Sequence, residues 1–103
     1  MGGKKWAPGK SLEQRKAEAF DLVVARAVAG ARCPENDEVG SNIMPQLARD
    51  GKIKIKVYAL NWRVVTIMEG PHAGKTTMPA PAGQVPYRII YKDHIMMRRR
   101  AMP

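Results

Sequence analysis

The sequence has little cysteine, few acidic residues and no long apolar run. Its one cysteine, Cys33, cannot form an internal disulfide, and no apolar stretch approaches the roughly 18 residues that a membrane-spanning helix needs. The first residues are basic, but they lack the apolar segment of a secretory signal peptide. We therefore expect a protein of a reducing, cytoplasmic compartment that does not associate with membranes.

Groups for catalysis or metal binding are also scarce. A structural zinc site takes four cysteine or histidine ligands, whereas this chain has only Cys33, His72 and His94, which are widely spaced. No set of nucleophile, base and acid is recognisable. We therefore expect a protein that is not an enzyme and that uses no metal or cofactor.

The segment 70–76 invites comparison with a phosphate-binding P-loop. Only three residues separate its glycines, where a P-loop has four. Pro79 and Pro81 follow, so no regular helix can begin there to hold a phosphate. We expect instead a turn that lets Lys75 reach a nucleic-acid phosphate.

The charge of the chain is strongly one-sided. Nine acidic residues stand against 18 lysines and arginines, which gives a formal net charge of +9. Such a field attracts polyanions, and nucleic acid is the leading one. A simpler interpretation is that the charge only keeps a small protein in solution. The length of 103 residues fits one domain.

Residues 1–10 are rich in glycine and lysine, which is typical of a flexible basic arm, and a helix is predicted after them. Ser11 is a candidate N-cap, Gln14 completes a capping box, and Gly30 marks the helix end. Apolar residues recur at three- and four-residue steps and form one stripe: Leu12, Ala19, Phe20, Val23, Ala27 and Val28. This pattern predicts a long amphipathic helix that packs on a core.

A short acidic segment and a second helix follow. Residues 33–40 have room for at most a turn or two of helix. Asn42 is a candidate N-cap, Pro45 falls in the first turn, where a missing N–H costs nothing, and Gly51 ends the helix. The expected inner face consists of Ile43 and Leu47, and the expected outer face of Asn42, Met44, Gln46 and Arg49.

Lysines alternate with aliphatic residues over 52–58. Because side chains alternate across a strand, three ammonium groups are expected on one face and three aliphatic groups on the other. A turn at 59–61, with an asparagine at positive φ, leads to a second strand over 62–68. Trp62 is expected to be partly buried as a lid over Phe20, with an exposed platform at the hairpin as the alternative.

The remaining part of the chain is less regular. A loop is expected after the hairpin, then a linker rich in proline, alanine and glycine over 78–86, and a third strand over 87–91. The tail 94–103 carries an arginine triplet, and we expect it to fray unless a partner orders it.

Three segments follow one another in a recognisable order. They are the helix end at 30–36, the segment 42–53 with its Arg-Asp-Gly-Lys-Ile step, and the hairpin that continues through Ile67. Together, over about residues 12–68, they resemble winged helix-turn-helix regulators of bacterial and phage origin, in which a recognition helix runs into a hairpin wing. That family has two full helices between its first helix and the wing, whereas this chain has only 17 residues between Cys33 and Gly51, so the middle helix must be shortened or lost.

The resemblance implies a small α+β domain of winged-helix-like fold over residues 11–68, with a loop, a strand and a basic tail in 69–103. It implies a DNA-binding transcriptional regulator that uses helix 42–50 and hairpin 52–68. Together with the basic loop and tail, the residues expected to bind nucleic acid are Asn42, Met44, Gln46, Arg49, Lys52, Lys54, Lys56, Arg63, Lys75, Arg98, Arg99 and Arg100. Double-stranded DNA is the expected partner, and a homodimer is expected because paired modules double the phosphate contacts.

A second resemblance rests on residues 63–75, where a strand leads into a Gly-x-x-x-Gly-Lys loop. This arrangement is similar to the KOW motif of ribosomal and transcription-elongation proteins, which lies on a small SH3-like barrel. It implies RNA, a ribosome or a polymerase as the partner. A third alternative, based on charge alone, is a small phage or host factor whose basic face docks on an acidic protein surface.

Overall fold

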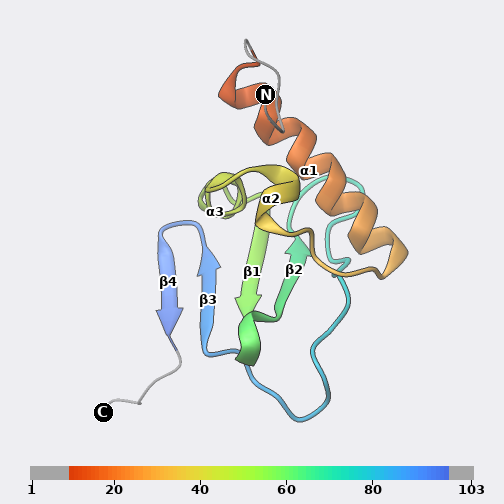
Figure 1. Cartoon of the computed structure of the whole chain (residues 1–103), viewed down its shortest axis with the longest axis vertical. Coiled ribbons are helices and arrows are strands. Elements are labelled where there is room, and N and C mark those ends of the chain that lie inside the picture. Colours follow the sequence, from red (N-terminus) through yellow and green to blue (C-terminus); the bar gives the residue numbers. More distant parts are fainter. Residues whose placement is uncertain (1–9, 98–103) are drawn as a thin grey trace.

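The computed structural model describes the backbone of residues 10–97 and the side chains of residues 10–93. The described residues form an α+β fold, as predicted (Figure 1). The helices are α1 (Leu12–Ala29), α2 (Asn36–Val39) and α3 (Ile43–Arg49). The strands are β1 (Ile53–Val57), β2 (Arg63–Ile67), β3 (Arg88–Tyr91) and β4 (His94–Met97), with a short 3-10 turn at Ala59–Asn61.

Helix α1 begins and ends where the sequence predicts. The Gln14 amide donates to the Ser11 hydroxyl at 3.0 Å, and the Gln14 side chain accepts from the Ser11 amide at 3.2 Å, which completes the capping box. Gly30 ends the helix in a left-handed conformation with φ of +68°. The predicted apolar stripe is too wide, however, because Leu12 is 39% exposed and Val28 51% exposed.

Helix α3 is held mainly by its C-terminal end. Gly51 has φ of +82°, and its amide donates to Ala48 O while the next amide donates to Leu47 O, which satisfies two helix-end carbonyls. At the other end Asn42 occupies the N-cap position, as predicted, but its side chain makes no capping hydrogen bond. Its φ of +69° shows that the residue turns the chain instead.

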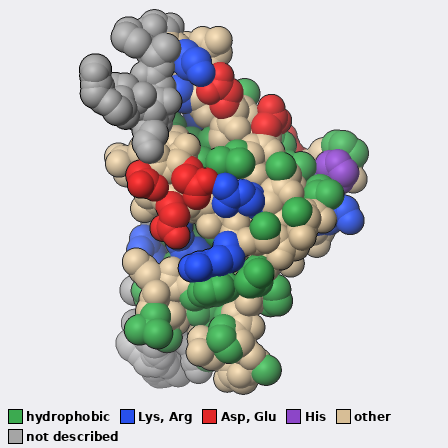
Figure 2. Space-filling view, turned by 45° about the vertical axis from the view of Figure 1, so that its right-hand side comes forward, with side chains coloured by type: hydrophobic (Ala, Val, Ile, Leu, Met, Phe, Trp, Pro, Cys, Tyr) green, Lys and Arg blue, Asp and Glu red, His purple; other side chains and the backbone are tan. Residues whose placement is uncertain are grey.

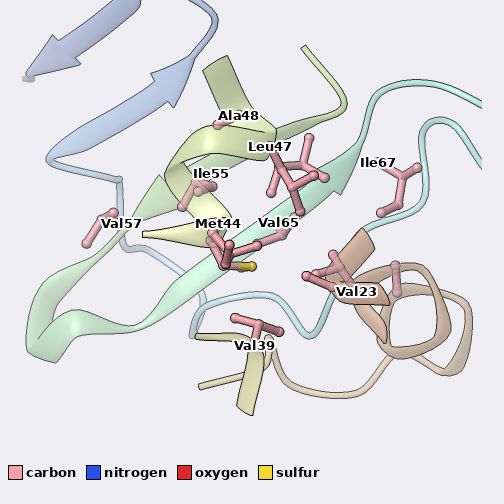
Figure 3. Packing of buried hydrophobic residues seen from close by; sticks show 13 residues of the cluster. Val23, Val39, Met44, Leu47, Ala48, Ile55, Val57, Val65 and Ile67 are labelled. Atoms are coloured by element: carbon pink, nitrogen blue, oxygen red, sulfur yellow. The ribbon is translucent and has the colours of Figure 1, made fainter. Parts of the chain in front are cut away.

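The core lies between the helices and one face of the sheet. Residues of α1, α3, β1 and β2 form one buried cluster, and Figure 3 shows Met44 and Leu47 of α3 beside Val65. Met44 is fully buried. The prediction that Met44 lies on the outer face of the helix is therefore wrong, because α1, α2, β1 and β3 all pack against α3.

The four strands form one antiparallel sheet in the order β2-β1-β3-β4. Strand β1 therefore lies inside the sheet, with β2 and β3 as neighbours, and not in a free-standing hairpin. The alternation predicted for β1 is confirmed, because Ile53, Ile55 and Val57 are buried while the intervening lysines are partly exposed. The β1–β2 turn has positive φ at Asn61, as predicted, and also at Leu60.

The C-terminal part contains a predicted strand and an unpredicted one. Strand β3 confirms the expectation for 87–91, but residues 94–97 pair with β3 as β4, so the prediction that the whole tail frays is wrong for them. The two-residue turn between these strands has Lys92 at φ +55°, a position usually taken by glycine or asparagine. That missing turn signal explains why the strand was not predicted.

The segment after β2 turns back along the outer edge of the same strand. The Thr77 amide donates to Val65 O at 3.0 Å, and Thr76 forms a bridge with Thr66. From there the chain runs along the β2 side of the sheet and then, in the view of Figure 1, passes beneath the strands to reach β3. Within residues 10–97 the sheet is open and does not close into a barrel. No helix in this part of the chain is both long and apolar enough to cross a membrane.

Candidate nucleic-acid interface

The positive charge is concentrated in the half of the chain that forms the sheet. Residues 51–103 contain ten lysines and arginines but only two acidic residues. Residues 1–50 contain eight lysines and arginines and seven acidic residues. Most acidic side chains therefore belong to the helices and their ends. On the face seen in Figure 2 they lie in the upper and middle part, at the height of the helices. Seven of these ten cations lie among the described residues, and they give the sheet half the more positive charge.

One face of the sheet is free of helices. The helices pack against the face that carries Ile53, Ile55 and Val57, so Lys54 and Lys56 point to the opposite face. We call this opposite surface the open face; its positions are Lys54 and Lys56 of β1, Val64 and Thr66 of β2, and Ile89 and Tyr91 of β3, and of these only Val64 is buried. None of these six positions carries a carboxylate.

An aromatic ring lies among the cations of the open face. The β1–β3 register places Lys54 next to Tyr91, and the Lys54 ammonium lies 5.5 Å from the ring centroid. The Lys92 ammonium lies 5.3 Å from the same centroid. Lys56 lies opposite Ile89, and neither Lys54 nor Lys56 forms an ion pair with a described residue. The pair of lysines is therefore available to an external anion.

Lys52 does not join the predicted ridge of three lysines. Its ammonium lies 2.8 Å from a Glu69 carboxylate oxygen and 5.9 Å from the Phe20 ring centroid of α1. The side chain thus turns toward the helix side at the start of β1. The prediction of three equivalent lysines is wrong for this residue, because the acid that neutralises it comes from the loop after β2.

Arg63 is also directed away from the open face. It lies opposite Val57 in the β1–β2 ladder, on the helix side, and donates to Asn36 Oδ1 at 3.0 Å and to Pro34 O at 2.9 Å. These bonds tie the start of β2 to the segment around α2. Arg63 therefore has a structural role that local sequence does not indicate, and it does not extend the lysine pair.

Trp62 is partly buried, which confirms the expected burial. Its ring packs against Arg32, however, and not against Phe20. The Arg32 guanidinium carbon lies 4.5 Å from the Trp62 ring. Phe20 lies near Lys52 at the start of β1, whereas Trp62 pairs with Tyr58 beyond the end of this strand. The prediction that Trp62 covers Phe20 is therefore wrong, because the two rings lie near opposite ends of β1.

Three of the residues predicted on helix 42–50 share one outer stripe. Asn42 and Arg49 are exposed, Gln46 is partly exposed, and their spacing of four and three residues places them on one side of the helix. Met44 is buried, so it cannot contact nucleic acid together with these three residues. The stripe and the lysines Lys54 and Lys56 are on opposite sides of β1, so the structure does not bring the two groups together.

The predicted loop around Lys75 is compact. Gly70 and Gly74 both have positive φ, and Gly74 N donates to Ile67 O while Ile67 N donates to Lys75 O. The Lys75 side chain is exposed and forms no ion pair with the described residues. Arg98, Arg99 and Arg100 lie outside the described residues.

A groove on the helix side was not anticipated from the sequence. It has a volume of about 820 Å³ and an apolar floor that includes Ile55, Val57 and Ile90. Arg63 and Arg88 line it together with the acidic residues Glu35 and Asp37. Because both signs of charge face this groove, it is a poorer site for a polyanion than the open face.

The described residues offer no obvious place for other chemistry. No three histidine, cysteine, aspartate or glutamate side chains gather closely enough there to hold a metal ion. Burial raises the pKa of the Cys33 thiol to about 11, which keeps it protonated and unreactive at neutral pH. No family model, curated protein or solved structure that was compared with the chain matches it.

Proposed function

We propose that this protein is a non-catalytic nucleic-acid-binding protein and that the open face of its sheet is the contact surface. The observation that carries the proposal is the pair Lys54 and Lys56, which stands beside Tyr91 on a helix-free face without an acidic partner. An unpaired ammonium on a surface free of carboxylates gains most from a phosphate, because no internal ion pair must first be broken.

The wider charge distribution supports the same surface. Ten of the 18 cationic residues belong to the half of the chain that forms the sheet, against two of the nine acidic residues. Such an asymmetry steers a polyanion toward one side of a small protein. Binding then releases the counterions that were condensed on the phosphates, and this release makes the affinity depend steeply on salt.

A second candidate is recognition of duplex DNA by α3, as in a winged-helix transcriptional regulator. The observation in its favour is the outer stripe of Asn42, Gln46 and Arg49, since amide and guanidinium groups are the side chains that read base edges. Arg49 has no ion-pair partner among the described residues. This candidate uses the helix side, so variants can separate it from the first.

Fluorescence anisotropy with labelled duplex DNA, single-stranded DNA and single-stranded RNA, at about 50 and 200 mM salt, tests the proposal. The decisive variant is Lys54→Gln/Lys56→Gln. We expect weaker binding and a slope of log K against log [salt] that is shallower by about 1.4 to 1.8, since each of the two lost phosphate contacts contributes about 0.7 to 0.9. Gln46→Ala/Arg49→Ala tests the second candidate in the same titration.

The matched control is Lys10→Gln/Lys16→Gln, which removes the same charge from the helix side. Lys10 lies 2.8 Å from Glu18, and Lys16 lies 2.6 Å from Asp50, whose hydrogen bond raises the Lys16 pKa. These lysines are already neutralised, so the control should bind like the wild type. Equal losses in both double variants would show that only net charge matters, and the open face would then lose its assigned role.

A further inference from the structure

We infer that the open face is a platform for single-stranded nucleic acid, with Tyr91 stacking on a base while Lys54 and Lys56 contact the backbone phosphates. This inference rests on the proposed function and specifies its ligand. It follows from the shape of the surface, from the position of the aromatic ring and from the spacing of the lysines.

The shape of the surface disfavours a duplex. Strand β1 has β2 on one side and β3, then β4, on the other. Strands lie about 4.8 Å apart, so the axes of the outer strands are roughly 14 Å apart before side chains are added. The major groove is about 12 Å wide and admits a helix or a two-stranded ribbon. Lys54 and Lys56 stand near the middle of the sheet and cannot enter such a groove.

The position of Tyr91 favours exposed bases. Its ring is partly exposed on the open face, and the ammonium groups of Lys54 and Lys92 lie 5.5 and 5.3 Å from its centroid. Long lysine side chains can swing outward to phosphates while a base occupies the ring face. Aromatic rings beside cations are the recurring means of binding single strands, because every base has a π-face, whereas stacked bases inside a duplex cannot reach the ring.

The spacing along β1 fits an extended strand. Lys54 and Lys56 are two residues apart on one face, which corresponds to about 6.6 Å. This distance is close to the separation of successive phosphates in a strand whose bases are unstacked. Lys56 lies opposite Ile89, which adds apolar surface next to Tyr91.

The test is an anisotropy titration of labelled single strands of about 12 nucleotides, a length within the site sizes of such platforms. A hairpin duplex and an abasic strand of equal charge are titrated in parallel. Tyr91→Leu keeps an apolar side chain in β3 but removes the π-face, and Tyr91→Phe keeps the π-face. We expect Tyr91→Leu to weaken binding of the single strand by about tenfold or more, and Tyr91→Phe to bind like the wild type.

Two comparisons make the result specific to stacking. On the abasic strand, wild type and Tyr91→Leu should bind equally, because no base is available to the ring. Tyr87→Ala removes another exposed tyrosine, one that lines the groove on the helix side, and should leave single-strand binding unchanged. Circular dichroism and thermal melting establish that each variant is folded.

The outcomes separate the inference from the proposed function. If the single strand binds no tighter than the duplex, or if Tyr91→Leu binds it like the wild type, the platform is refuted, although salt-dependent binding through Lys54 and Lys56 stands. If the wild type binds none of these nucleic acids at about 50 mM salt, both the platform and the proposed function are refuted. The DNA and RNA strands are compared directly to show which sugar the surface prefers.

Discussion

Thr77 and Val65 exchange two hydrogen bonds across the outer edge of β2. The Val65 amide donates to the Thr77 hydroxyl at 2.9 Å, and the Thr77 amide donates to Val65 O at 3.0 Å. Thr77 is fully buried, and no other polar or charged residue among those described is. This exchange fixes the segment after the glycine loop against the sheet and thereby covers one edge of the fold.

Replacing Thr77 by valine should therefore destabilise the protein. The side chain keeps its size, but the buried Val65 amide loses its acceptor, which costs about 1–3 kcal/mol. Urea unfolding followed by circular dichroism measures the change. Thr76→Val is the control, because Thr76 is exposed, and it should change stability by less than about 0.5 kcal/mol. Equal effects at both positions would contradict the assigned role of the hydroxyl.

Met44 provides a test of the packing of α3. Because its side chain is fully buried beside Val65, Met44→Ala should lower the free energy of unfolding by about 2–5 kcal/mol. Gln46→Ala, on the outer stripe of the same helix, should cost less than about 1 kcal/mol. Chemical denaturation of both variants measures these losses in the free energy of unfolding. A small effect at Met44 would mean that this side chain faces solvent, as the sequence pattern had indicated.

Gly51 and Gly30 allow a comparison of two left-handed glycines. Both have positive φ, so alanine should cost about 1–2 kcal/mol at either site. At Gly51 the new Cβ would also lie 2.9 Å from Lys92 Cε, whereas at Gly30 nothing lies within 4 Å. Lys92 Cε is the far end of a flexible side chain and can move aside, so the two variants should lose similar stability in thermal melting. A much larger loss from Gly51→Ala would show instead that the Lys92 side chain is fixed against the end of α3.

Cys33 should make stability depend on pH in the alkaline range. Burial raises its pKa from 9.0 to about 11, so between these values the folded protein keeps a proton that the unfolded chain releases. Its contribution is therefore fully present below pH 9 and is lost as the pH rises toward 11, by about 1–2 kcal/mol. Denaturation at several pH values measures this loss.

The control for this pH dependence is Cys33→Ala, which retains all other titrating groups. The stability difference between wild type and Cys33→Ala should shrink between pH 9 and 11 and stay constant below pH 8. A thiol reagent at pH 8 should also react far more slowly with folded than with unfolded protein. A difference that does not change with pH would show that the Cys33 thiol is not desolvated.

Features set by neighbouring residues were predicted well. The capping box of Ser11 and Gln14, the helix end at Gly30 and the turn at Gly51 depend on residues within a few positions of one another. The alternation in β1 is local in the same sense. The placement of Met44 failed because seven residues of helix do not reveal how many neighbours cover it, and here α1, β1 and β3 leave only a narrow outer stripe.

Features set by distant partners were not predictable. Nothing near Lys52 in the sequence indicates that Glu69 neutralises it, and nothing near Arg63 indicates its bonds to the segment around Asn36. Pairing of β3 with β1 changes a hairpin into the middle of a sheet and brings Tyr91 to Lys54. The candidate interface thus combines two lysines that the sequence identified with a tyrosine that only the fold supplies.

The contact surface can be mapped by amide chemical shifts in 15N-labelled protein during titration with a short single strand. We expect the largest shifts at Lys54, Lys56, Ile89 and Tyr91, and we expect them to diminish at high salt. Amides of the outer stripe at Gln46 and Arg49 should move little. Shifts confined to that stripe, or to residues lining the groove on the helix side, would contradict the assignment of the open face as the nucleic-acid contact.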